Sequence, residues 1–120
     1  MTVNVLGTEY AIFVKKYDED EAFSRREIDG YCDGMMKQIV VCDMTTYKGF
    51  EHEPEEYCVT TQRHALRHEI VHAFFFESGL ADSSNTVNVP WATNEELVDW
   101  LAWQGPKIYA AWREVGALDV

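Results

Sequence analysis

The chain has 120 residues, of which 47% are hydrophobic and 13% aromatic. This length suits a single domain over residues 1–120, and the apolar content excludes an intrinsically disordered chain. Acidic residues (21) outnumber basic ones (10) to give a net charge of -11, and the basic residues are scattered, so nucleic acid is a poor direct partner.

The N-terminal segment predicts a β-hairpin. Residues 3–6 and 10–14 are rich in β-branched and aromatic side chains, and residues 7–9 favour a tight turn between them. The segment lacks a cationic stretch followed by an apolar one, and no apolar run approaches the roughly 18 residues that span a bilayer. We therefore expect neither a secretion signal nor a membrane anchor.

Residues 17–54 predict one buried strand. Residues 17–28 favour a short polar helix or a loop, and residues 30–34 are rich in turn-forming residues. Residues 37–42 are apolar on both faces, which is typical of a strand inside a sheet. Residues 44–54 are irregular and predict a loop before a long helix.

Residues 55–76 predict that long helix, which Thr60 or Thr61 caps and Gly79 ends. Its apolar stripe at helical spacing consists of Leu66, Ile70, Ala73 and Phe74. Three consecutive phenylalanines, residues 74–76, indicate that the end of the helix is apolar nearly all round and packs against the sheet.

A polar loop over residues 82–90 precedes a second helix. Thr93 and Glu96 have the form of a capping box at its start, and residues 105–106, Gly-Pro, are expected to interrupt it. Its inward side is expected to hold Leu97, Trp100 and Leu101. Strands followed by helices predict an α+β fold, in which a small, mostly antiparallel sheet packs against both helices.

Residues 68–72 read His-Glu-Ile-Val-His, the pattern H-E-x-x-H. On a helix, His68 and His72 project from one face, where both imidazoles can bind a single tetrahedral Zn²⁺. Glu69 would lie beside the metal's water and act as a general base. The alternative is a solvated helix that carries these polar residues by chance.

A zinc ion held by two histidines needs a third protein ligand and keeps one position for water. Glu95 and Asp99 share a face of the second helix, so Glu95 can bind the metal while Asp99 accepts the outer ring N–H of a ligating histidine. Glu96 is the alternative third ligand. The residue four positions after Glu96, on the same helix face, is Trp100 and not an acid.

The remaining polar and aromatic residues of interest have structural interpretations. No functional role is expected for His52 or His64, and His64 is expected to be exposed, since three histidines at four-residue steps spread over about 12 Å and cannot share one ion. The cysteines fit neither a redox motif nor a zinc ribbon and are expected to be buried, reduced thiols of a cytoplasmic protein: Cys32, Cys42 and Cys58. The tryptophans are expected to pack the core and its rim: Trp91, Trp100, Trp103 and Trp112.

Together, H-E-x-x-H and the N-E-x-x-x-D of residues 94–99 resemble the gluzincin clan of zinc metallopeptidases. This resemblance implies that Glu95 is the third zinc ligand and that Asp99 orients a ligand. Size and element order over residues 31–109 resemble the minigluzincins and the ImmA/IrrE-like peptidases of phages, mobile elements and bacterial regulators, which implies a zincin-like fold and a phage origin. Thermolysin-like members stabilise the oxyanion with a tyrosine, for which Tyr109 and Tyr31 are candidates.

The predicted function is therefore a zinc metallopeptidase that hydrolyses peptides or proteins in the cytoplasm, the host's if the chain is phage-encoded. A metal-activated water attacks the peptide bond, and Glu69 takes its proton and passes it to the leaving amine. A zinc-bound domain that binds a partner protein without cutting it is the alternative, because a chain of this size leaves little for a deep cleft. A domain without metal is the third possibility.

Overall fold

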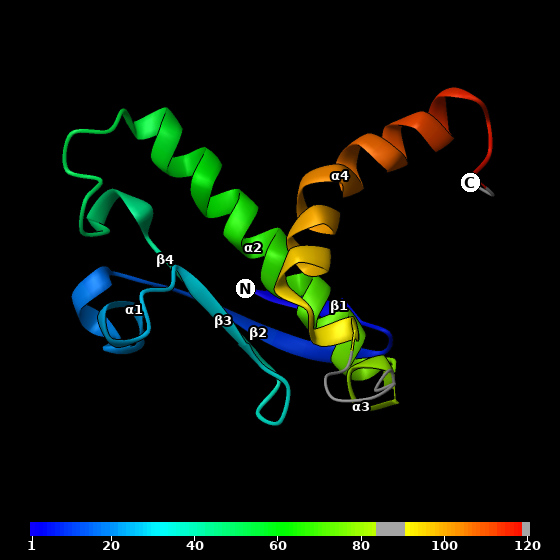
Figure 1. Ribbon diagram of the computed structural model, residues 1–120, viewed down its shortest axis with the longest axis horizontal. Coiled ribbons are helices and arrows are strands. Elements are labelled where there is room, and N and C mark those ends of the chain that lie inside the picture. Colours follow the sequence, from blue (N-terminus) through cyan, green and yellow to red (C-terminus); the bar gives the residue numbers. More distant parts are fainter. Residues whose placement is uncertain (84–90, 119–120) are drawn as a thin grey trace.

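The computed structural model describes residues 1–83 and 91–118. The fold is α+β, as predicted, with one four-stranded mixed sheet and two long helices (Figure 1). The elements in chain order are β1 (Thr2–Val5), β2 (Thr8–Lys15), η1 (Tyr17–Glu19), α1 (Ala22–Arg25), β3 (Gly30–Asp33), β4 (Gln38–Cys42), η2 (Met44–Thr46), α2 (Glu55–Glu77), α3 (Leu80–Ser83), η3 (Trp91–Thr93) and α4 (Glu95–Glu114).

Strands β1 and β2 form the predicted hairpin. Their register pairs Val5 with Thr8, so Leu6 and Gly7 make the turn. Both turn residues have positive φ, 51° and 91°, which is the conformation that two-residue hairpin turns use. Asn4 supports the turn, since its Oδ1 accepts a hydrogen bond of 2.9 Å from the backbone N–H of Gly7.

Strand β4 lies inside the sheet, as its two apolar faces predicted. The strand order is β1-β2-β4-β3, with β4 parallel to β2 and antiparallel to β3. Residues 30–34, predicted to be turns, mostly form the edge strand β3. A Cβ at Gly30 would lie 3.0 Å from the carbonyl oxygen of Val40 and 3.4 Å from Cγ of Glu69, so the glycine serves close approach and not a turn.

Helix α2 covers the sheet, and the main core lies between the helix and the strands. Leu66, Ile70 and Ala73 of the predicted stripe pack in or against that core, whereas Phe74 is 39% exposed. The buried residues of this cluster are Val5, Tyr10, Ile12, Ile39, Val41, Ala65 and Ala73.

The helix starts earlier than the predicted caps. Pro54 is the N-cap, and Glu55 and Glu56 fill the first turn, where negative charge is favourable. Thr60 and Thr61 therefore lie within the helix. Gly79, with φ of 82°, follows its last turn as predicted.

Glu77 fixes the C-terminal end of α2 to the sheet. Its carboxylate accepts hydrogen bonds from the hydroxyls of Tyr10 at 2.7 Å and Thr8 at 3.1 Å. It also forms an ion pair with Lys37, which precedes β4. One carboxylate thus joins the helix end to both β2 and the β3–β4 connection.

Helix α4 continues through Gly105 and Pro106, where an interruption was predicted. Proline lacks the N–H that would bond to the carbonyl of Ala102, and Arg67 Nε of α2 donates to that oxygen instead, at 2.8 Å. Gly105 has no Cβ to clash with the proline ring. A hydrogen bond between the two helices therefore replaces the bond that is missing within α4.

The start and the inward face of α4 also differ from expectation. Asn94, not Thr93, is the N-cap, and its Oδ1 accepts a bond of 2.9 Å from the backbone N–H of Leu97. Val98 and Ala102 are the buried residues of the helix. The tryptophans lie outside the core, with Trp91, Trp100, Trp103 and Trp112 each about half exposed.

The three cysteines are free thiols, as predicted, with Cys42 and Cys58 buried and Cys32 half-buried. Burial is the main cause that raises the pKa of Cys32 to about 12 and that of Cys42 to about 11. Of the predicted loop over residues 82–90, residues 84–90 lie outside the described residues. Within the described part of the chain, no helix has both the length and the apolar character that crossing a membrane requires.

Candidate metal centre

His68 and His72 lie one turn apart on α2, and both side chains are largely buried. Their ring centroids are 4.9 Å apart. One ligand atom from each of His68, Glu69 and His72 lies within 4.8 Å of the others. The H-E-x-x-H residues therefore surround a common point, as the spacing predicted.

Glu95 reaches this point from α4. Its carboxylate lies 2.6 Å from Nε2 of His72 and 3.2 Å from Nε2 of His68. Because Asn94 caps the helix, Glu95 occupies the first helical position and its side chain turns toward α2. Glu96 is exposed and, among the described residues, forms no ion pair with either histidine.

Two imidazole nitrogens and a carboxylate are a donor set that suits Zn²⁺ and leaves a fourth position for water. Ligand atoms on a tetrahedral zinc lie about 3.3 Å from one another, given metal–ligand bonds of about 2.0–2.1 Å. The 3.2 Å between Nε2 of His68 and Oε2 of Glu95 is close to this separation. The 2.6 Å from Nε2 of His72 leads to the other carboxylate oxygen, Oε1, and is a hydrogen-bond length.

The two histidines respond differently to the acids around them. Burial lowers the pKa of His68, but Glu69, Asp99 and Glu95 raise it by more, so it lies above its usual value. For His72 the lowering by burial prevails over the effect of Glu95. His72 is thus the histidine whose ring more readily stays neutral, the form that binds a metal.

Glu69 is a buried acid beside this centre, only 5% exposed. Burial raises its pKa to about 7; Glu95 and Asp29 act in the same direction, while His68 opposes it. Near neutral pH the carboxyl can therefore both accept and return a proton. The close approach of Gly30 described above forms one wall of its surroundings.

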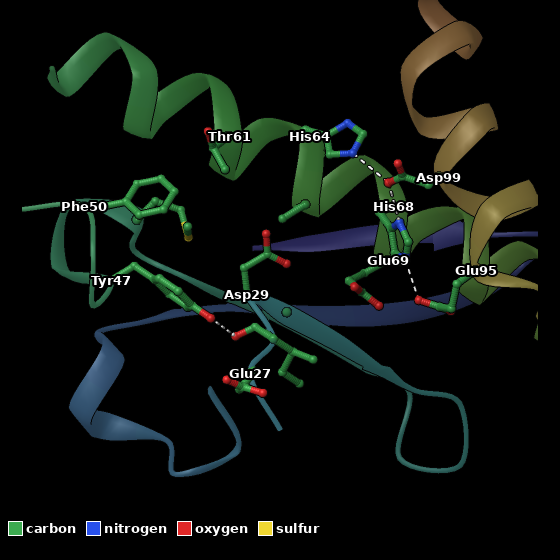
Figure 2. A pocket seen from close by; sticks show the side chains of 14 residues that line it. Glu27, Asp29, Tyr47, Phe50, Thr61, His64, His68, Glu69, Glu95 and Asp99 are labelled. Carbon is green, nitrogen blue, oxygen red and sulfur yellow. Dashed lines mark hydrogen bonds and ion pairs between the residues drawn. The ribbon is translucent and has the colours of Figure 1, made fainter. Parts of the chain in front are cut away.

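Asp99 joins two histidines of α2. Its Oδ1 lies 3.1 Å from Nδ1 of His68 and 2.8 Å from Nε2 of His64 (Figure 2). The ring of His64 also stacks on Trp103, with 4.0 Å between centroids. Burial raises the pKa of Asp99, and the bonds from His64 and His68 outweigh it, so the pKa lies below the usual range.

His64 was expected to be exposed, which is wrong: its side chain is 14% exposed. It lies too far along α2 to share the site of His68 and His72, but it reaches the carboxylate that orients His68. The sequence contains a signal for the contact of His64 with Asp99, because His64 precedes His68 by one turn and Trp103 follows Asp99 by one turn.

Two pockets, of about 330 and 640 Å³, open beside the centre. Glu69 and Glu95 line both of them, so the centre lies where they meet. Asp29, which the sequence analysis did not single out, lies with Tyr47 and Phe50 in the smaller pocket (Figure 2). Burial raises the pKa of its carboxyl.

Neither tyrosine proposed for the oxyanion is supported by its position. Tyr109 is 51% exposed and lines neither pocket, since α4 continues past Pro106 and carries it about 21 Å along the axis from Glu95. Tyr31 lines the larger pocket, but its hydroxyl donates to Asp20 at 2.6 Å. His52 is exposed.

Comparison of this chain with protein-family models, with curated proteins and with solved structures finds no match. The geometry of the centre and the two sequence motifs are therefore the features of this chain that bear on its function.

Proposed function

We propose that this chain is a zinc-dependent metallopeptidase with His68, His72 and Glu95 as its metal ligands. The observation that carries the proposal is the convergence of one carboxylate from α4 on the Nε2 atoms of two histidines from α2. When bound, zinc would make a water acidic and polarise a substrate carbonyl. Membership of the gluzincins, with a phage origin, belongs to the same proposal.

Glu69 is the general base of the proposed reaction. It takes the proton of the attacking water and gives it to the leaving amine as the C–N bond breaks, which returns the carboxylate to its starting state. A pKa of about 7 suits both transfers. Because Glu69 lines both pockets, a peptide that extends into both of them would pass it.

A zinc-bound domain that binds a protein partner without cutting it would need the same three ligands. It would not need a buried base, and burying a carboxyl costs stability unless the group is compensated. The 5% exposure of Glu69 therefore favours hydrolysis over binding alone. Free thiols suit a reducing compartment, so we place the proposed activity in the cytoplasm.

The test combines metal analysis with peptide cleavage. Purified protein is analysed for zinc and incubated with a mixed peptide library, with and without a chelator, and products are identified by mass spectrometry. We expect one zinc per chain and cleavage that stops with the chelator and returns with added zinc. Glu69→Gln, purified in parallel, controls for contaminating proteases. Zinc without cleavage would favour the binding domain, and protein that binds no zinc would overturn the proposal.

A further inference from the structure

The hydrogen bonds of Asp99 determine which ring nitrogens carry hydrogen. An ionised carboxylate only accepts hydrogen bonds, so Nδ1 of His68 and Nε2 of His64 must both donate to Oδ1. In the neutral ring, the Nε2 of His68 then has a free lone pair. That atom is the one that faces Glu95 and would bind the metal.

His64 has one hydrogen-bonding function in this arrangement. Its Nδ1 is buried and, among the described residues, has no hydrogen-bond partner, so its only bond is the one to Asp99. The stacking on Trp103, at 27° between ring planes, sets the direction of that bond. The imidazole is therefore held in place to act on the carboxylate.

Asp99 needs such support because its side chain is 45% exposed. A carboxylate on α4 bonded to His68 alone could rotate toward solvent and release that ring. His64 binds the same oxygen from one turn earlier on α2. The carboxylate is thus held at two points of one helix, and the plane of the His68 ring is fixed with it.

We propose that His64 is a positioning residue for the metal centre, which acts through Asp99 to hold His68 ready to bind zinc. The inference rests on the proposed function, because it takes His68 as a zinc ligand. It extends the centre to a residue that does not bind the metal and that also lines the smaller pocket. A purely structural His64, which only packs α4 against α2, is the competing explanation.

Two substitutions separate the bond from the packing. His64→Phe keeps a ring to stack on Trp103 and loses the donor, whereas His64→Gln loses the ring but places an amide N–H near the position of Nε2. Zinc dissociation constants are measured by competition with a chromophoric chelator. Melting of each variant in excess chelator checks the metal-free fold, and His64→Leu replaces His64→Phe if the latter does not melt cooperatively.

We expect His64→Phe to weaken zinc binding about tenfold, as for other outer partners of metal ligands, and His64→Gln to restore most of the affinity. In an Asp99→Asn background, His64→Phe should cause little further loss, because its effect passes through Asp99. Equal affinities for wild type and His64→Phe, or the same loss in both backgrounds, would overturn the inference while leaving the zinc site intact. A wild-type protein that binds no zinc would overturn both proposals.

Discussion

The carboxylate of Glu95 lies 2.6 Å from Nε2 of His72, so the first turn of α4 meets the face of α2 that carries both histidines of the candidate centre. This contact joins two motifs that lie at residues 68–72 and 94–99 of the sequence. It is also the contact that distinguishes Glu95 from its neighbour: both side chains are exposed, but within the described part of the chain Glu96 forms no ion pair with His68 or His72.

Replacing Glu95 should therefore remove a zinc ligand. We expect Glu95→Ala to weaken zinc binding by at least about 100-fold, the upper end of the losses seen for outer partners of ligands. Glu96→Ala is the matched control, with the same change one residue away, and should bind zinc like wild type. Chelator competition measures both constants. A larger loss in Glu96→Ala than in Glu95→Ala would move the third ligand.

Replacing the base should separate chemistry from metal binding. Glu69→Gln keeps the shape of the buried side chain but cannot accept the proton of the water, so we expect a loss of about 10²–10⁴ in kcat. Its zinc content should equal that of wild type, because Glu69 is not assigned as a ligand. If Glu69→Gln cleaves a peptide found in the library experiment as fast as wild type does, another group is the base.

The local parts of this fold and centre were predictable from the sequence. The hairpin, the buried strand β4 and the long helix α2 follow from alternation, apolar runs and helical spacing. His68, Glu69 and His72 belong to one turn of one helix, so their spacing alone brings them together. Glu95 and Asp99 share a face of α4, so their contacts with the histidines of α2 were predictable once α4 was placed beside α2.

The parts that failed depend on how α4 packs against α2, which local spacing does not encode. His64 was judged only as a rival metal ligand, although its partner is a carboxylate on the other helix. Pro106 was expected to interrupt α4. That expectation failed because Arg67, which lies on another helix, donates to the carbonyl that the proline leaves without its helical bond. Tyr109 was chosen by residue type, and the direction of α4 carries it away from the centre.

The carboxylate of Glu77 should make stability depend on pH. The bond from Lys37 is the largest cause that lowers its pKa, followed by those from Tyr10 and Thr8. A group with a lowered folded-state pKa stabilises the fold above its unfolded pKa, about 4.3, and this contribution is lost as the pH falls through the folded value. We expect Glu77→Gln to melt below wild type at neutral pH, with a difference that shrinks on acidification.

Glu9→Gln is the control for this experiment, because it removes one negative charge from an exposed position of β2. It should change the melting temperature little at any pH. A difference between Glu77→Gln and wild type that stays constant from neutral to acidic pH would show that the charge of Glu77 does not stabilise the fold.

The bond between Arg67 and Ala102 should stabilise the helix pair more while Pro106 is present than without it. Ala102 is 1% exposed, so removing the donor leaves a buried carbonyl unpaired. We expect Arg67→Ala to lower the free energy of unfolding by about 1–3 kcal/mol. Pro106→Ala supplies the missing helical N–H to the same oxygen, and in that background the cost of Arg67→Ala should fall by about 1 kcal/mol.

Urea unfolding of the four proteins gives this coupling as a double-mutant cycle. The slope of each transition must match that of wild type for the comparison to hold. Equal costs of Arg67→Ala with and without the proline would mean that the guanidinium stabilises the protein by packing its side chain, and that the carbonyl freed by Pro106 contributes nothing to the docking of α4.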